Sequence, residues 1–251
     1  MMCYQTWPLE LSASEFTVGR WGICRLERSQ DGGAFLTGPE RERAESFRCR
    51  LRRAEWLGAR AGLRRMLQEA GIAPRPSECN ITKDRRGKPL VDIGGAGGAK
   101  RVDGSLAHKD GLAGFAAVWD PTVKIGIDLE AVSTKPWRCR RAFATRGDYL
   151  LDSESSDSYY CVLWCCKEAA SKALGKGLLI DFRELVISES ASGRFTVGGN
   201  GRDLMAGRYL LFDGMVAAVV MMSHAAGCGR RDRSVRTGRG GNRGEEKFNG
   251  A

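Results

Sequence analysis

The segment KIGIDLE, residues 124–130, sets two acidic residues, Asp128 and Glu130, two positions apart. Its apolar and β-branched content predicts a strand, in which alternate side chains point to the same face. Two adjacent carboxylates repel each other unless a cation or a proton lies between them. Carboxylate oxygens are also the ligands that Mg²⁺ prefers. The segment therefore predicts either a hard-metal site or the solvated acidic face of an edge strand, and alone it favours neither.

A second segment, WCCKEAASK over residues 164–172, carries a glutamate and a lysine four positions apart. On a helix, Glu168 and Lys172 would lie on one face. Such a pair is most often a surface ion pair of small energetic value. Taken alone, this segment favours the structural interpretation, and only its combination with residues 124–130 indicates chemistry.

Two long helices and several strand groups would have to position these segments. Apolar residues recur at spacings of three and four over residues 40–69, where many arginines predict a strongly positive helix face. Thr37 and Glu40 have the spacing of a capping box. The second helix is predicted over residues 158–174, and Asp213-Gly214 predicts a hairpin. Strands are predicted within 81–93, at 113–119 and 123–130 as a pair with each other, and at 185–187, 194–197, 208–212 and 215–222.

The two predicted helices resemble each other. Aligning Trp56 with Trp164 brings Arg60 opposite Glu168, and each helix is followed by strands. A duplicated half would explain the match. Helices separated by groups of strands, without regular alternation, indicate the α+β class.

Composition and charge narrow the class of protein. The 251 residues are 42% hydrophobic and 28% charged, which excludes wholesale disorder, collagen and a disulfide miniprotein. The longest apolar run, Met215–Met222, is too short to cross a bilayer, and residues 1–10 have no secretory pattern. Nine cysteines without a CxxC pair are expected to be reduced, in a cytoplasmic protein.

The chain is strongly basic, with 40 Lys and Arg against 30 Asp and Glu, for a formal charge of +10. This charge favours anionic partners without choosing among them. Residues 227–251 combine glycine and arginine and are predicted to form a disordered basic tail. The tail resembles arginine-glycine segments that contact RNA, but for one short copy a solvated terminus is the favoured explanation.

Together, residues 124–130 and 164–172 resemble the two-part signature of the 4′-phosphopantetheinyl transferase superfamily. Supporting segments follow the family order: RAEWLGAR at 53–60, GKPL at 87–90, SLAH at 105–108 and GKG at 175–177. The length resembles the larger surfactin-synthetase type, a pseudo-dimer of two α+β halves, each a long helix on a small antiparallel sheet. We therefore expect an N-terminal half over residues 1–122, a C-terminal half with the metal site over 123–226, and the tail over 227–251.

The resemblance implies an enzyme that moves the phosphopantetheine arm of coenzyme A to a serine of an apo carrier protein and releases adenosine 3′,5′-bisphosphate. It assigns Mg²⁺ to Asp128, Glu130 and Glu168, catalysis to Glu168, Lys172 and Asp128, and coenzyme A to Arg60, Lys88, His108 and Lys172. Glu168 is also a candidate base for the serine. If the halves are equivalent, Arg60 and Glu168 should face a shared cleft.

The sequence departs from the family pattern at two positions. Ala107 replaces a serine, and Lys109 replaces a serine or threonine. Either one hydrogen bond to coenzyme A is lost, or Lys109 supplies a phosphate contact instead. The family's acidic residue between the two motifs corresponds best to Asp148.

The expected partners are coenzyme A and an acidic apo carrier protein, with a monomer as the expected state and no membrane. The residues do not choose among fatty acid, polyketide, nonribosomal peptide and aminoadipate pathways. Three alternatives remain: an RNA-binding protein that uses the tail, a coenzyme A-binding family member without transferase activity, for which Ala107 is the hint, and a metal-dependent nuclease that uses the same carboxylates.

Overall fold

The structure, a computed structural model, describes residues 4–10, 17–26, 36–73, 75–94, 100–151, 155–199 and 205–223. The predicted tail over 227–251 lies outside the described residues. Among the described residues, no helix combines the length and the apolar character needed to cross a bilayer.

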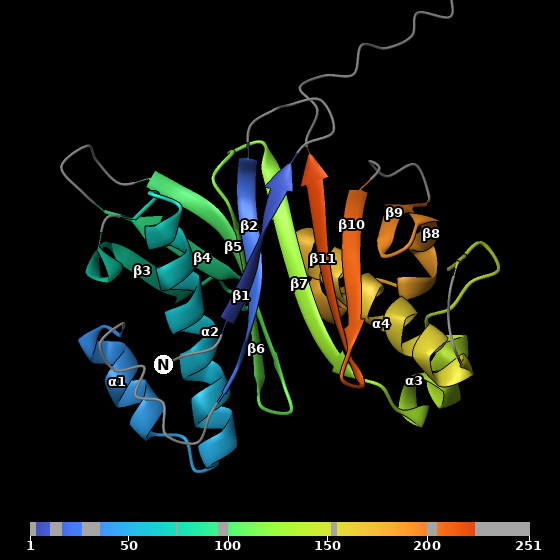
Figure 1. Cartoon of the computed structure of the whole chain (residues 1–251), viewed down its shortest axis with the longest axis horizontal. Coiled ribbons are helices and arrows are strands. Elements are labelled where there is room, and N and C mark those ends of the chain that lie inside the picture. Colours follow the sequence, from blue (N-terminus) through green and yellow to red (C-terminus); the bar gives the residue numbers. More distant parts are fainter. Residues whose placement is uncertain are drawn as a thin grey trace, which may run out of the picture.

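Two antiparallel sheets form the centre of the molecule (Figure 1). The first has the strand order β1-β2-β6-β5-β4-β3 and the second has the order β7-β11-β10-β9-β8. Without β1, the two orders follow the same pattern. The first sheet contains β1 (Tyr4–Glu10), β2 (Thr17–Arg25), β3 (Cys79–Lys83), β4 (Pro89–Ile93), β5 (Lys100–Lys109) and β6 (Leu112–Val118). The second contains β7 (Val123–Ala131), β8 (Val186–Ala191), β9 (Arg194–Gly198), β10 (Met205–Phe212) and β11 (Met215–Ser223).

One long helix lies on the outer face of each sheet: α2 (Arg50–Glu69) on the first and α4 (Ser156–Ala173) on the second (Figure 1). The α+β prediction of two similar halves is therefore confirmed. We call β1–β6 with α1 and α2 the first half, and β7–β11 with α3 and α4 the second half. The shorter elements are α1 (Gly38–Glu45), α3 (Thr134–Cys139) and four 3₁₀ turns at Pro76–Glu78, Arg140–Ala142, Gly177–Leu179 and Phe182–Glu184.

The single helix predicted over residues 40–69 is two helices, because the chain becomes extended at Cys49, the N-cap of α2. The capping box is present at the start of α1, where the Thr37 amide donates to Glu40 Oε2 at 3.0 Å. The break lets α1 fold back, so that Glu40 reaches Arg64 Nη2 at 2.9 Å. Arg64, which is fully buried on α2, thereby gains a partner for its charge.

The prediction that residues 113–119 and 123–130 pair with each other is wrong. Strand β6 pairs with β2 and β5, whereas β7 pairs with β11. The connection between Val118 and Val123 carries the chain from one sheet to the other instead of forming a hairpin. The division into domains at residue 122 stays a prediction. The hairpin at Asp213-Gly214 is confirmed, with both residues at positive φ (48° and 70°).

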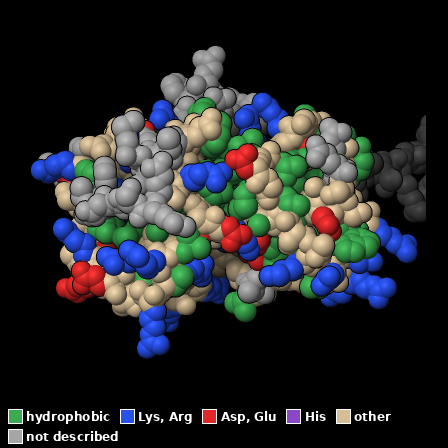
Figure 2. Space-filling model, turned by 60° about the horizontal axis from the view of Figure 1, so that its bottom comes forward, with side chains coloured by type: hydrophobic (Ala, Val, Ile, Leu, Met, Phe, Trp, Pro, Cys, Tyr) green, Lys and Arg blue, Asp and Glu red, His purple; other side chains and the backbone are tan. Residues whose placement is uncertain are grey.

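Three hydrophobic clusters hold these layers together. One lies between α2 and the first sheet, one between the second sheet and α4, and one between the two sheets. The third, which we call the inter-sheet core, joins Trp21 and Val118 of the first sheet to Ile127, Leu129 and Val219 of the second. Its members come from both halves, so the halves pack against each other through a shared hydrophobic layer. Viewed from below, hydrophobic side chains reach the surface in the middle of the molecule, next to acidic and basic ones (Figure 2).

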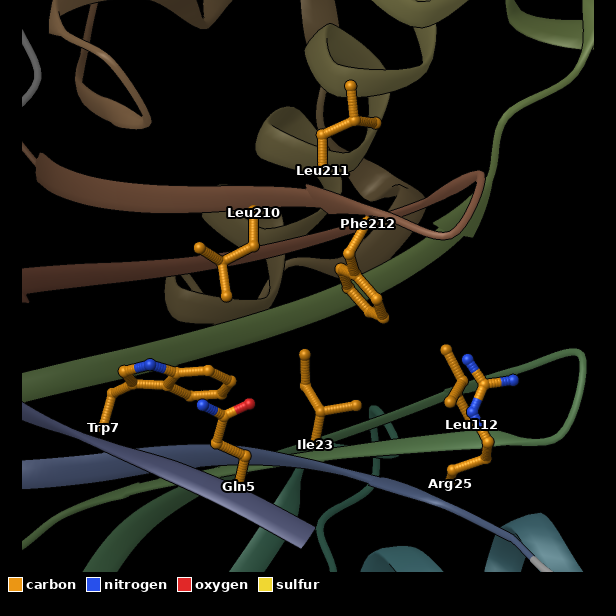
Figure 3. Close-up of a pocket in the computed structure, with 8 residues that line it drawn as sticks. All are labelled: Gln5, Trp7, Ile23, Arg25, Leu112, Leu210, Leu211 and Phe212. Atoms are coloured by element: carbon orange, nitrogen blue, oxygen red, sulfur yellow. The ribbon is translucent and has the colours of Figure 1, made fainter.

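On one side the inter-sheet core opens into a groove of about 530 Å³ (Figure 3). Trp7 and Ile23 line it from the first sheet, and Leu210 and Phe212 point toward them from β10. At one end, Arg25 Nη2 reaches Asp213 Oδ2 at 2.9 Å and links the two halves.

Candidate functional site

Helix α4 lies unusually close to β7. Gly126 belongs to the face of β7 that α4 covers, and a Cβ atom there would overlap the carbonyl oxygen of Ala169. Because side chains alternate along a strand, Asp128 and Glu130 share that face, whereas Ile127 enters the inter-sheet core. The glycine of the first motif is therefore the point at which the strand meets the helix that carries the second motif.

Strand β7 is an end strand of its sheet, and β5 of the other half holds its free edge. The backbone N–H of Ile125 donates to Asp103 Oδ1 at 2.9 Å, and that of Ile127 donates to Ser105 Oγ at 3.0 Å. These bonds give an acceptor to two backbone N–H groups that would otherwise need a neighbouring strand. They also fix the position of β5 along β7. The first half therefore helps to position Asp128 and Glu130 of the second half. No pattern of residues along the chain indicates this use of Asp103 and Ser105.

Two of the predicted metal ligands are paired with lysines. Asp128 Oδ1 lies 2.6 Å from Lys172 Nζ, which also donates to the backbone oxygen of Ile127 at 3.0 Å. Glu130 Oε2 lies 2.8 Å from Lys109 Nζ. Lys109, which the sequence suggested as a phosphate contact, therefore binds a carboxylate in this structure.

Glu168 lies close enough to both carboxylates to be affected by their charge. Burial, the largest cause, acts together with the charges of Asp128 and Glu130 and against the charge of Lys172 to raise the pKa of Glu168 to about 7. A carboxyl group with this pKa changes protonation near neutral pH, as a general base must. The structure thus brings Asp128, Glu130, Glu168 and Lys172 together.

These side chains have the chemistry of a hard-metal site, although they are not assembled around an ion. Among the described residues, no three acidic, His or Cys side chains converge closely enough to ligate one metal. However, Asp128 Oδ2 is buried and has no hydrogen-bond partner. A buried carboxylate oxygen without a partner is costly unless a cation satisfies it. The donor set therefore fits Mg²⁺, and the assignment of the three ligands stays a prediction.

Lys88 approaches the same region from the turn between β3 and β4. Its Nζ lies 2.9 Å from Asp103 Oδ1. The turn also touches the end of α4, because Arg86 Nη1 donates to the backbone oxygen of Gly175 at 3.4 Å. A loop of the first half thus brings positive charge to the C-terminal end of the helix that carries Lys172.

His108 lies near the end of β5 and faces α2. Its Nδ1 is 3.0 Å from Arg52 Nη1 and 3.6 Å from Glu55 Oε2. Burial lowers the pKa of His108, as do the charges of Arg52 and Lys172, whereas Glu55 raises it. The imidazole is therefore neutral at physiological pH.

Arg60 is not brought to the carboxylates. It is 6% exposed, stacks on Trp56 at 3.7 Å and lies 3.4 Å from Glu40 Oε1. Burial lowers its pKa to about 10. No interaction joins Arg60 to Glu168, so the expected shared cleft receives no support. Its role toward coenzyme A stays a prediction.

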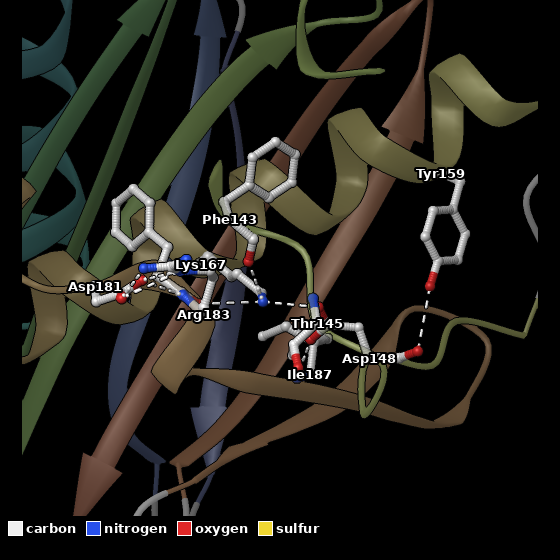
Figure 4. A network of polar contacts seen from close by, with 9 residues as sticks. Phe143, Thr145, Asp148, Tyr159, Lys167, Asp181, Arg183 and Ile187 are labelled. Atoms are coloured by element: carbon white, nitrogen blue, oxygen red, sulfur yellow. Dashed lines mark hydrogen bonds and ion pairs between the residues drawn. The ribbon is translucent and has the colours of Figure 1, made fainter. Parts of the chain in front are cut away.

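Asp148 has a structural role, because its ion-pair partner is the buried Lys167 (Figure 4). It does not join Asp128 and Glu130. Lys167 Nζ contacts Asp148 Oδ2 at 2.8 Å, the backbone oxygen of Phe143 at 2.7 Å and that of Phe182 at 3.2 Å. The ammonium group has three donors, and all three are used. The side chains of Lys167 and Asp148 are 0% and 2% exposed. The lysine that precedes Glu168 in the motif is thus structural, and it ties α4 to the segment after α3.

A helix-covered pair of antiparallel sheets with paired carboxylates and lysines at their junction defines a two-half α+β protein with a charged group between its halves. Residues 124–219 match the family described as the 4′-phosphopantetheinyl transferase superfamily. The chain is also similar to the 4′-phosphopantetheinyl transferase HetI of Nostoc sp. (strain PCC 7120 / SAG 25.82 / UTEX 2576). The identity is 30% over 189 residues, which cover 70% of this chain and 78% of HetI. The chain belongs to the 4′-phosphopantetheinyl transferase superfamily.

Proposed function

We propose that this protein transfers the 4′-phosphopantetheine arm of coenzyme A to a serine of an apo carrier protein. The observation that carries the proposal is the group formed by Asp128, Glu168 and Lys172. It combines a buried carboxylate oxygen without a partner, a carboxyl group with a pKa of about 7 and a lysine within 2.6 Å of a carboxylate. Phosphoryl transfer depends on positioning and charge neutralisation, which such a group supplies.

In the proposed reaction, the serine oxygen bonds to the β-phosphorus of coenzyme A. The bond from that phosphorus to the bridging oxygen breaks, and adenosine 3′,5′-bisphosphate leaves with the bridging oxygen. Glu168 accepts the serine proton at a carboxylate oxygen, because its pKa of about 7 leaves part of the population ionised at neutral pH. Lys172 and Lys88 offset the charge of the diphosphate oxygens.

Asp128, Glu130 and Glu168 would hold Mg²⁺, which neutralises the charge of the diphosphate when bound. The structure shows Lys172 and Lys109 on two of these carboxylates. In the proposed reaction both lysines exchange a carboxylate partner for substrate oxygens.

The proposed type is the larger, surfactin-synthetase type, because one chain supplies both sheets and β5 of one half fixes β7 of the other. A monomer is sufficient for such a site. The net charge of +10 favours an acidic carrier, since opposite charges accelerate encounter. We further propose a cytoplasmic location, where coenzyme A and carrier proteins occur together.

Intact-mass spectrometry of an acidic apo carrier incubated with this chain, coenzyme A and Mg²⁺ tests the proposal. We expect the mass of one phosphopantetheine to be added to the carrier, and we expect no addition with EDTA or with Glu168→Gln. Glu69→Gln is the matched control, because Glu69 pairs with Arg65 on α2 at 3.2 Å and lies far along the chain from both motifs. Loss of transfer in both variants alike would contradict the role of Glu168.

A coenzyme A-binding member without transfer is the second candidate, and Ala107 was its hint. In the structure Ala107 is 5% exposed and packs in the inter-sheet core. An alanine there suits the packing, which weakens the argument that a ligand contact is missing. Tight coenzyme A binding without modification of several acidic carriers would favour this candidate. Salt-sensitive RNA binding without coenzyme A binding would favour the RNA alternative.

A further inference from the structure

The first turn of α2 and the end of β5 meet at His108. Side chains alternate along β5, so Ala107 enters the inter-sheet core while His108 turns to the opposite face, toward α2. There it meets Arg52 and Glu55, which neither motif of the sequence includes. The three side chains form a polar group at the border of the candidate site, where the charge of Lys172 also acts on His108.

The contact between Arg52 and His108 determines the direction of the hydrogen bond. Arg52 Nη1 lies 3.0 Å from His108 Nδ1. A guanidinium group has only N–H donors and stays protonated in proteins. Nδ1 must therefore accept, and an imidazole that accepts at Nδ1 is neutral with its proton on Nε2. The bond made at one ring nitrogen thus fixes the chemical character of the other.

Glu55 holds Arg52 and the turn after β5 in place. Its side chain is 3% exposed. One oxygen, Oε1, accepts the backbone N–H of Gly111 at 3.1 Å, which anchors the turn between β5 and β6. The other, Oε2, lies 3.5 Å from Arg52 Nη1 and 3.6 Å from His108 Nδ1. Since Gly111 stands at φ +81°, a conformation that favours glycine, the turn is closely specified and β5 ends at a fixed place.

We propose that Arg52, itself held by Glu55, is a positioning residue that keeps His108 as the neutral tautomer protonated at Nε2, so that Nε2–H is available as an uncharged donor at the site. Toward coenzyme A this rests on the proposed function, in which that N–H donates to an oxygen of the substrate. The tautomer itself does not depend on the reaction. A fixed neutral donor gives direction to the contact without adding a positive charge beside Lys172.

The charges around the imidazole favour this state. Arg52 and Glu55 face it from α2, and Lys172 acts from α4. Two of these three groups are cations, and burial also disfavours the protonated ring. Glu55 and a hydrogen bond to the backbone of His108 itself oppose them, and the carboxylate of Glu55 is shared with Arg52 and with Gly111.

Nitrogen-15 NMR of the histidine-labelled full chain tests the tautomer directly. The chain has two histidines, and His224→Gln leaves the signals of His108 alone. Near pH 8 we expect a protonated Nε2 and an unprotonated Nδ1, each with the shift of a single tautomer. In Arg52→Met, we expect a mixture of the two tautomers and a higher pKa of His108. Arg52→Lys keeps a cationic donor and should restore much of the single-tautomer signal.

Arg53→Met is the matched control, since Arg53 is an exposed arginine on the same helix turn and the substitution removes the same charge. It should leave the His108 signals unchanged. A proton on Nδ1, or equal signals in Arg52→Met and Arg53→Met, would overturn the proposal. Glu55→Gln should retain the Gly111 contact through its amide oxygen and lower the pKa of His108, and an unchanged titration would contradict the role of Glu55.

Kinetics and binding separate this inference from the proposed function. For Arg52→Met we expect the KM for coenzyme A to rise about fivefold, the effect of one hydrogen bond, with kcat nearly unchanged. A general loss of structure would lower kcat as well and would change the unfolding midpoint. If the wild-type chain transfers nothing, NMR still decides the tautomer of His108, and calorimetry still measures whether Arg52→Met weakens the binding of coenzyme A. A fall of kcat alone in Arg52→Met would contradict a positioning role in binding.

Discussion

The two halves share a strand order and a long helix, but they use the charges of those helices differently. On α2, Arg60 and Arg64 are buried and paired with Glu40 of α1, inside the first half. On α4, Lys167 is likewise paired within its half, whereas Glu168 and Lys172 face β7 at the border with the other half. Charges that are neutralised within a half stabilise it, and those left at the border are available to a ligand.

The helices also approach their sheets differently. A Cβ at Gly62 of α2 would meet the ring of Phe115, so a phenyl ring separates α2 from the first sheet. In the second half, Gly126 touches the backbone of α4 itself at Ala169. The closer approach brings Glu168 and Lys172 to the level of the carboxylates of β7. One glycine and one phenylalanine thus give the two similar halves different contacts between helix and sheet.

Lys167→Met should have the largest effect on stability. The substitution leaves Asp148 buried with an uncompensated charge, although two backbone N–H groups still donate to it. Breaking a buried ion pair in this way costs about 3–5 kcal/mol. Urea denaturation measures the loss.

Arg64→Met in the first half is the matched comparison. Glu40 would keep Arg60 at 3.4 Å, so we expect a smaller loss of about 2–3 kcal/mol. If Arg64→Met cost more than Lys167→Met, the view that the first half shares its buried charge among more partners would be wrong.

Gly126→Ala should separate α4 from β7. Overpacking of this kind costs about 1–3 kcal/mol, and the shift of Glu168 should reduce transfer far more than the loss of stability explains. Gly38→Ala is the control, because a Cβ at Gly38 meets nothing within 4 Å. Thermal unfolding and the carrier mass assay measure both effects. Wild-type transfer in Gly126→Ala would refute the argument from close approach.

Glu168→Gln should stabilise the metal-free protein at alkaline pH. The folded-state pKa of about 7 exceeds the ordinary value of 4.5, so the contribution of Glu168 to stability is present below pH 4.5 and is lost as pH rises through 7. The amide never ionises and escapes this loss. After allowance for partial exposure, we expect the variant to be more stable by about 2 kcal/mol near pH 8.

Denaturation midpoints of wild type and Glu168→Gln over a pH series give the difference. It should shrink as pH falls from 7 toward 4.5. Added Mg²⁺ should stabilise wild type more near pH 8 than near pH 6, because binding at pH 6 must first remove a proton. A difference that is independent of pH would contradict the raised pKa.

Arg25→Ala should have the smallest effect. The Arg25–Asp213 pair joins the halves, but its side chains are 60% and 73% exposed. Exposed ion pairs contribute about 0–1 kcal/mol, and salt should remove even that. A loss well above 1 kcal/mol in thermal unfolding would mean that this contact, in addition to the inter-sheet core, holds the halves together.

Local patterns in the sequence predicted most of the elements. The alternation of residues 124–130 predicted β7, the spacing over 158–174 predicted α4, and Thr37 with Glu40 predicted the start of α1. The α+β class and the repeated half also followed from the sequence. Such features depend on backbone geometry over a few neighbouring residues, so they can be read without knowing what packs nearby.

The sequence alone did not predict β1, β2, β5 and α3, the break before α2 or the partner of β7. The sequence identified the signature residues, and the tertiary structure decided which charged side chains form ion pairs with each other. Lys109 pairs with Glu130, Lys167 with Asp148, and Arg60 remains with α1. The partner of a charged side chain depends on which distant element packs against it and on how much water that packing excludes. For Glu130 and Lys109 both follow from the crossing between Val118 and Val123, because that crossing places β7 against β5 of the other half.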